Sequence, residues 1–162
     1  MKRILCLLFV IEALFCDAQN KDIISGYKGD ISVKAMLGKH PDLTPAITTS
    51  HEYIFDSGIG LGGGIGVILP KISDNNTELI LIPYLQGGYY FKSIGSQGLS
   101  PFARLKAGIE WGEYGDNETG GLFMPEIGIG KRPFELGFGL DYELISDQKD
   151  ILKPMVFISI FF

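Results

Sequence analysis

The chain has 162 residues and a formal net charge of −5 at pH 7, a length that suits one domain with its own core. The acidic balance excludes nucleic acid as a partner, because no basic stripe is present to neutralise phosphates. The content of 22 glycines and 11 phenylalanines, with 46% hydrophobic residues, favours an all-β protein over a helical one.

The N-terminal segment 1–18 is expected to be a secretory signal peptide, which leaves 19–162 as the mature barrel domain described below. Lys2 and Arg3 precede an apolar stretch that is too short to cross a bilayer as a helix, and small residues lead to a cleavage site after Ala18. The alternative is cleavage before Cys16 and lipidation of its thiol.

Both cysteines, Cys6 and Cys16, would leave with this segment, so the mature chain is expected to have no disulfide and no cysteine-based metal site. Two imidazoles, His40 and His51, remain, which makes a multi-histidine zinc site unfavourable. We therefore predict neither a metal nor a cofactor.

The rest of the chain shows alternating apolar and polar residues, the period of β-strands, in eight runs. Clusters containing Gly, Pro, Asn or Asp separate the runs, and such short connections join antiparallel neighbours. In chain order the predicted strands are 26–38, 43–54, 57–70, 77–92, 98–113, 119–131, 133–146 and 152–162.

The third run, GIGLGGGIGVILP at 58–70, has glycine at every even position from Gly58 to Gly66 and mainly apolar residues at the odd ones. A surface facing water has little reason to lose five side chains, whereas a narrow barrel lumen needs room for the large side chains of other strands. The bare face is therefore predicted to look inward and the apolar face to meet lipid. The fold class predicted is an antiparallel up-and-down eight-stranded transmembrane β-barrel.

Strand length and closure agree with this prediction. A tilted membrane strand needs about 9–11 residues, and bacterial single-chain barrels have an even number of strands. Closure also removes the unpaired edges that apolar strands would otherwise expose. Aromatic residues near the strand ends are expected to form girdles at the membrane interfaces; these are Tyr89, Phe91, Trp111, Phe134 and Phe162.

Six segments with this pattern resemble the small outer-membrane β-barrel proteins of Bacteroidetes-type bacteria, which are OmpA/OmpX-like eight-stranded barrels. They are GYKGDISVKAML, TTSHEYIFDSGIGLGGGIGV, IPYLQGGYYF, SPFARLKAGIEWG, GGLFMPEIGIG and ELGFGLDYEL. The ending MVFISIFF resembles the outer-membrane assembly signal, with Phe162 preceded at alternate positions by Ile160 and Ile158. The resemblance implies the fold and recognition of Phe162 by the assembly machinery, and it implies little about activity.

Charged residues on the predicted inward faces form a candidate lumen network. Its members are Arg104, Lys106, Glu110, Glu126, Glu135, Asp141 and Glu143. Antiparallel pairing of the fifth and sixth runs predicts Lys106 near Glu126 and Arg104 near Gly128, to within a residue or two. The structural interpretation is a set of ion pairs that satisfies buried charge, and the functional one is a polar path or small binding site.

Two motifs suggest other chemistry and are interpreted structurally. The glycines at 58–63 match a dinucleotide-binding pattern, but the strand continues where that pattern needs a helix. Ser50 and His51 could belong to a hydrolase, but adjacent strand residues point to opposite faces. No catalytic residue is predicted.

The expected protein is a monomeric, non-enzymatic barrel in the outer membrane of a Gram-negative bacterium, in contact with outer-membrane lipid. Its lumen is expected to be packed by side chains, and its role to be structural or that of an interaction platform. Two alternatives remain: a soluble lipocalin-like binder of an apolar ligand, and an outer-membrane lipid hydrolase.

Overall fold

The computed structural model describes residues 25–37, 43–69, 79–91, 99–111, 120–144 and 151–162. The predicted signal peptide, the connecting segments and the outer residues of several predicted runs lie outside these ranges. No helix in the described part of the chain is both long and apolar enough to cross a membrane.

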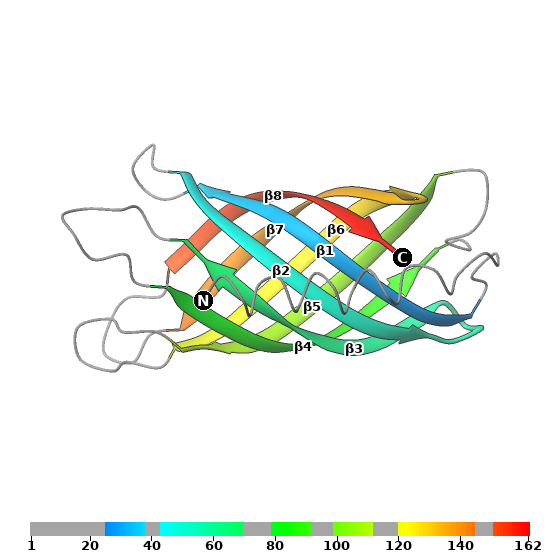
Figure 1. Ribbon diagram of the computed structural model, residues 1–162, viewed down its shortest axis with the longest axis horizontal. Coiled ribbons are helices and arrows are strands. Elements are labelled where there is room, and N and C mark those ends of the chain that lie inside the picture. The colour runs from blue at the N-terminus through cyan, green and yellow to red at the C-terminus, as the bar shows by residue number, and fades with distance from the viewer. Residues whose placement is uncertain (1–24, 38–42, 70–78, 92–98, 112–119, 145–150) are drawn as a thin grey trace, which may run out of the picture.

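Eight strands form one closed barrel in sequence order, with every neighbouring pair antiparallel and β1 paired to β8 (Figure 1). The predicted fold and the number of strands are therefore confirmed, and every boundary lies within three residues of its prediction. The strands are β1 Gly26–Leu37, β2 Leu43–Ile54, β3 Ile59–Ile68, β4 Ile80–Tyr90, β5 Ser100–Glu110, β6 Gly120–Lys131, β7 Phe134–Leu144 and β8 Ile151–Phe161.

The two ends of the barrel are named here by residues that lie at them. At the Phe162 end, β2, β4, β6 and β8 finish, and short turns join β2 to β3 and β6 to β7. At the Leu37 end, β1, β3, β5 and β7 finish. Figure 1 shows the strands running obliquely to the long axis between these ends, as closure of a barrel requires.

Burial alternates along the strands with the polarity inverted relative to a soluble barrel. The outward face is apolar and exposed: Leu85 is 74% exposed, Phe138 65% and Ile127 64%. The inward face holds nearly all of the buried charged side chains, with Lys28, Asp30 and Lys106 fully covered. The predicted assignment of the two faces is confirmed, including the glycine face of β3.

The lumen is filled by side chains in three zones. An apolar and aromatic cluster lies toward the Phe162 end and consists of Ile54, Tyr90, Phe102, Phe157 and Phe161. A charged zone follows. Toward the Leu37 end lies a larger apolar cluster of Met36, Ala46, Ile68, Ile80, Ile82, Tyr84, Leu122, Met124 and Met155.

Glycines provide room for these side chains, as predicted. A Cβ added at Gly64 would lie 2.7 Å from the hydroxyl of Tyr84, and one at Gly88 would lie 2.8 Å from Cγ of Arg104. At Gly62 the obstacle is backbone, because an added Cβ would collide with the carbonyl oxygen of His51. The missing side chains of β3 thus allow both a close approach to β2 and a filled lumen.

One interfacial aromatic differs from its prediction. Tyr89, Phe91, Trp111 and Phe134 are exposed near strand ends, but Phe162 is only 7% exposed. Its backbone pairs with Gly29 through two hydrogen bonds of 3.0 and 2.9 Å. Its ring lies against Gly29, where an added Cβ would be 2.5 Å from Cε2. The ring is covered because the glycine beside it has no side chain to hold it away from the barrel wall.

Candidate functional site: the charged lumen

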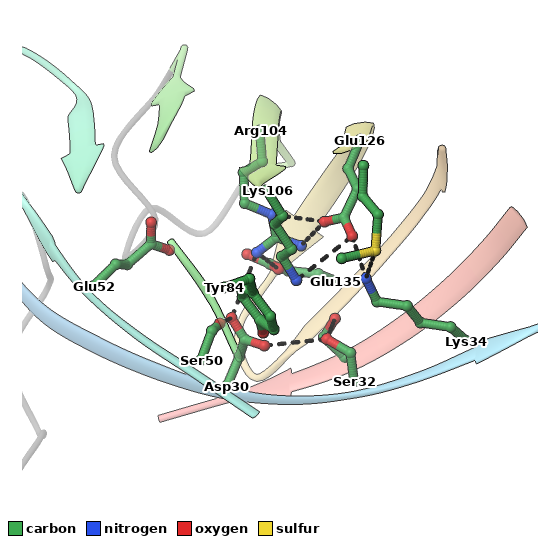
Figure 2. A network of polar contacts seen from close by, with 12 residues as sticks. Asp30, Ser32, Lys34, Ser50, Glu52, Tyr84, Arg104, Lys106, Glu126 and Glu135 are labelled. Atoms are coloured by element: carbon green, nitrogen blue, oxygen red, sulfur yellow. Dashed lines mark hydrogen bonds and ion pairs between the residues drawn. The ribbon is translucent and has the colours of Figure 1, made fainter. Parts of the chain in front are cut away.

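Arg104 of β5 is the hub of the charged zone (Figure 2). Its guanidinium lies 3.1 Å from Glu126 of β6, 3.0 Å from Glu135 of β7 and 3.5 Å from Asp30 of β1. The planar fork of an arginine presents several donors at once, so one side chain joins carboxylates from three strands.

Lys28 of β1 extends the network toward the Phe162 end. Its ammonium lies 2.9 Å from Glu135 and 3.1 Å from Glu52, and it donates a hydrogen bond of 3.1 Å to the hydroxyl of Tyr90. The Tyr90 hydroxyl also donates to Glu52. These contacts connect β1, β2, β4 and β7 across the lumen.

Glu126 forms ion pairs with three cations. Lys34 approaches it at 2.5 Å, Arg104 at 3.1 Å and Lys106 at 3.5 Å. Ser50 also stabilises the network, because its hydroxyl donates to Asp30 at 2.5 Å. A carboxylate surrounded in this way recovers much of the free energy lost when it leaves water.

The central network contains equal numbers of opposite charges. Its cations are Lys28, Lys34, Arg104 and Lys106, and its carboxylates are Asp30, Glu52, Glu126 and Glu135; none is more than 3% exposed. Such balance is what a dry interior demands, since an isolated buried charge costs several kcal/mol.

Aromatic rings cover the cations from the sides. The Arg104 guanidinium carbon lies 4.5 Å from the Phe102 ring centroid, and the Lys106 ammonium lies 5.0 Å from that of Tyr84. Lys28 lies 5.2 Å from the Tyr90 centroid. Cation–π attraction adds to the ion pairs of these three cations and helps to fix their positions.

A second group of charges, which we call the acidic cluster, contains Glu110 of β5 with Asp141 and Glu143 of β7. All three carboxylates lie inward toward the Leu37 end and are at most 3% exposed. Lys153 of β8 forms an ion pair with Glu143. Asp141 has no hydrogen-bond partner on either carboxylate oxygen among the described residues.

The seven predicted network residues therefore divide into two groups. Arg104, Lys106, Glu126 and Glu135 lie together, whereas Glu110, Asp141 and Glu143 form the separate acidic cluster. The β5–β6 register differs by two residues from the pairing first named: Arg104 lies opposite Glu126, and Lys106 opposite Met124. Lys106 still reaches Glu126 diagonally, so the pair is within the predicted tolerance.

Sequence reasoning missed half of the central network: Lys28, Asp30, Lys34 and Glu52. A signal was present, because Lys28, Asp30 and Lys34 share the inward face of β1 with Ser32 and Met36. Lys28 and Glu52 lie directly opposite each other in the β1–β2 register, so pairing of neighbouring strands could have found that contact. The other partners of Lys28, Asp30 and Lys34 include residues across the lumen on β5, β6 and β7, about which such pairing says nothing.

The two motifs with other chemistry are not catalytic constellations. Ser50 is buried in the lumen, while His51 stacks on Tyr27 on the outward side, with ring centroids 5.7 Å apart. The glycine pattern at 58–63 continues into β3 with no helix after it. Among the described residues no three His, Cys, Asp or Glu side chains are grouped so that they could hold a metal ion.

A closed eight-stranded barrel with lipid-compatible side chains outside and charges inside has a transmembrane β-barrel fold. No protein-family model matches the sequence, and no curated protein matches it. The solved structure of Neisserial surface protein A, NspA, is similar, with a TM-score of 0.50 and 10% identity over 85% of this chain and 96% of that one.

Two further similar structures are the attachment invasion locus protein Ail of Yersinia pestis and a de novo designed transmembrane β-barrel. Ail has a TM-score of 0.47 and 13% identity over 85% of this chain and 97% of its own. The designed barrel has a TM-score of 0.47 and 18% identity over 83% and 95%. At its low identity, the NspA similarity concerns the fold alone.

Proposed function

We propose that this protein is a non-enzymatic integral barrel of the outer membrane of a Gram-negative bacterium, with a packed lumen and a structural or interaction role. The observation that carries the proposal is the inverted polarity of the barrel. Exposing large apolar side chains on all eight strands to water would be unfavourable at about 25 cal/mol per Å², whereas lipid is their natural solvent.

The soluble lipocalin-like alternative requires the opposite distribution of side chains. Such a barrel would hold an apolar ligand against an apolar inner face and present its charges to water. Here the middle of the lumen is occupied by Arg104, Glu126 and their partners. An apolar ligand at that place would have to separate desolvated ion pairs, which is strongly unfavourable.

The remaining parts of the proposal concern the route to the membrane. Cleavage near Ala18 would release the chain after export, and the assembly machinery would recognise the C-terminal segment that ends in Phe162. The mature barrel would be a monomer in contact with outer-membrane lipid. Its pattern of glycines and aromatics supports a place among the small barrels of Bacteroidetes-type bacteria.

The test is expression of the full chain in a Gram-negative host, followed by separation of inner and outer membranes. We expect the protein in the outer-membrane fraction, released by detergent and not by salt or carbonate. On a denaturing gel, the unboiled protein should migrate differently from the boiled one, because a folded barrel resists the detergent. Recovery in the soluble periplasmic fraction would contradict the proposal and favour the soluble alternative.

A further inference from the structure

The hydrogen-bonded wall of the barrel is interrupted between β6 and β7. Pairing with β7 is continuous along β6 from Lys131 back to Glu126 and resumes at Phe123, so Met124 and Pro125 are left out of it. Proline has no backbone N–H and is rare away from sheet edges for that reason. In a membrane, no water replaces a missing backbone bond. Pro125, in the middle of its strand, therefore marks a break in the wall.

The bond that Pro125 cannot make would point toward β7. The Pro125 carbonyl oxygen faces that strand, because a Cβ added at Gly139 would lie 2.7 Å from it. In an antiparallel sheet the N–H and C=O of one residue point to the same neighbour, so the missing N–H faces β7 as well. The register is the same on both sides of the break and places Leu140 opposite Pro125. The carbonyl oxygen of Leu140 is therefore the acceptor that loses its donor.

The charged side chains beside the break are held by strands on either side of it. Glu126 of β6 forms its ion pairs with cations of β1 and β5. On β7, Glu143 pairs with Lys153 of β8. Asp141 has no hydrogen-bond partner on either carboxylate oxygen among the described residues. These ion pairs attach β6 and β7 to other strands and not to each other.

A second proline, Pro83 of β4, makes a comparable break toward β5. A Cβ added at Gly108 would lie 2.5 Å from the Pro83 carbonyl oxygen, and continuous pairing of the two strands begins only at Tyr84. Here, however, an attraction crosses the break, since the Lys106 ammonium of β5 lies 5.0 Å from the ring centroid of Tyr84 of β4. The break at Pro125 is therefore the weaker of the two.

We infer that the wall between β6 and β7 opens locally at Pro125 while the other seven strand pairs stay closed. In the open state the segments 123–126 and 139–142 separate, and the lumen beside Met124 meets the surrounding lipid. Opening costs less here than elsewhere, because one backbone bond is already missing and the ion pairs of Glu126 and Glu143 stay intact. The break is a side opening built into the barrel, and it goes beyond the proposed role in the membrane.

Amide hydrogen exchange, resolved by residue with NMR on the full chain refolded in detergent micelles, tests the inference within one strand. Successive amides of β7 face opposite neighbours: those of Leu140 and Tyr142 face β6, and those of Gly139 and Asp141 face β8. After correction for intrinsic rates, we expect the first pair to exchange at least about tenfold faster, because local opening releases only the amides that face β6. Equal rates for the two pairs would overturn the inference.

Pro125→Val supplies the missing N–H and should slow exchange at Leu140 about twofold to tenfold, the effect of one added hydrogen bond. Pro154→Val is the matched control on β8. Pro154 also lies opposite Leu140, but Leu140 directs its backbone groups to β6, so the new N–H faces β1. This variant should leave exchange at Leu140 unchanged. Exchange that is not slowed in Pro125→Val, or that is slowed equally in both variants, would overturn the inference. The comparison within β7 uses the wild type alone and does not depend on the folding of either variant.

Discussion

At the scale of single residues, Glu126 is the side chain on which the balance of the central network depends, because it offsets Lys34, Arg104 and Lys106 together. Glu126→Ala should lower the free energy of unfolding in detergent by about 3–5 kcal/mol, since three desolvated cations lose their common partner. Adding Lys106→Ala should recover part of this loss. The measurement is a double-mutant cycle by thermal or denaturant unfolding.

Lys153→Ala supplies the control for that cycle, because Lys153 pairs with Glu143 in the acidic cluster and makes no described contact with Glu126. Its effect should add to that of Glu126→Ala within about 0.3–0.5 kcal/mol. Additivity between Glu126→Ala and Lys106→Ala would mean that these two residues are not coupled, in spite of the 3.5 Å distance between their charged atoms.

At this scale the sequence predicts which way a side chain points better than what it contacts. The inward positions of Arg104, Lys106 and Glu126 followed from alternation along their strands. The contact of Lys28 with Glu135 crosses the closed barrel and depends on its tilt and diameter, which alternation does not determine. The packing of Phe162 was missed because it depends on Gly29, a glycine on a strand far away in the sequence.

At the scale of the strand, β7 tests the lipid-facing surface. Leu136 and Leu140 are 55% and 40% exposed on its outward side. Leu140→Arg should destabilise the barrel by about 2–4 kcal/mol near the bilayer midplane, because a charge enters lipid. The readouts are the yield of assembled protein and its migration on a gel with and without heating. Leu136→Ile should leave both unchanged, and normal assembly of Leu140→Arg would contradict the outward assignment.

The glycine face of β3 gives a second test at this scale. Gly62→Leu should prevent folding, since its first side-chain carbon already collides with the β2 backbone at His51. Gly87→Ala is the matched control on β4, where an added Cβ would make an ordinary contact of 3.6 Å with Leu61. Ile65→Leu, on the outward side of β3, should be nearly silent. Refolding yield in detergent would distinguish these outcomes.

Strand positions and faces were the features most accessible from the sequence. Alternation and turn residues located all eight strands, and the glycine run of β3 revealed which face is inside. The β5–β6 register was less accessible and shifted by two residues. The turn sequence alone does not determine how many residues the connection between β5 and β6 uses. The alternation pattern does not settle the register either, because a shift of two residues keeps every side chain on the same face of its strand.

At the scale of the whole molecule, an even number of strands returns the chain to the side from which it starts. Both termini and the Phe162 end should therefore face the periplasm, and the connections near Asn75, Asp116 and Gln148, which lie outside the described residues, should face the exterior. An epitope inserted at Asn75 should be labelled by antibody on intact cells. Labelling only after lysis would reverse the orientation.

The filled lumen predicts that the wild-type barrel does not conduct. In planar bilayers we expect no single-channel events for the wild type, because aromatic, charged and apolar side chains occupy successive zones of the lumen. Glu126→Ala combined with Arg104→Ala should introduce conductance if the central network is the plug. Conductance in the wild type would contradict the packed lumen, and a silent double variant would show that other side chains close the path.

The closure between β1 and β8 has a consequence for how the barrel is made. Seven of its pairings join strands that are neighbours along the chain, but the eighth brings residues 30–36 against residues 155–161. Closing so long a loop loses much conformational entropy before any contact compensates for it, so this step should be the slow one. Until it occurs, β1 and the last strand added each offer an open edge to any other strand nearby. Successful assembly therefore depends on timing, with lipid or a helper strand covering these edges before a second unfinished copy can pair with them.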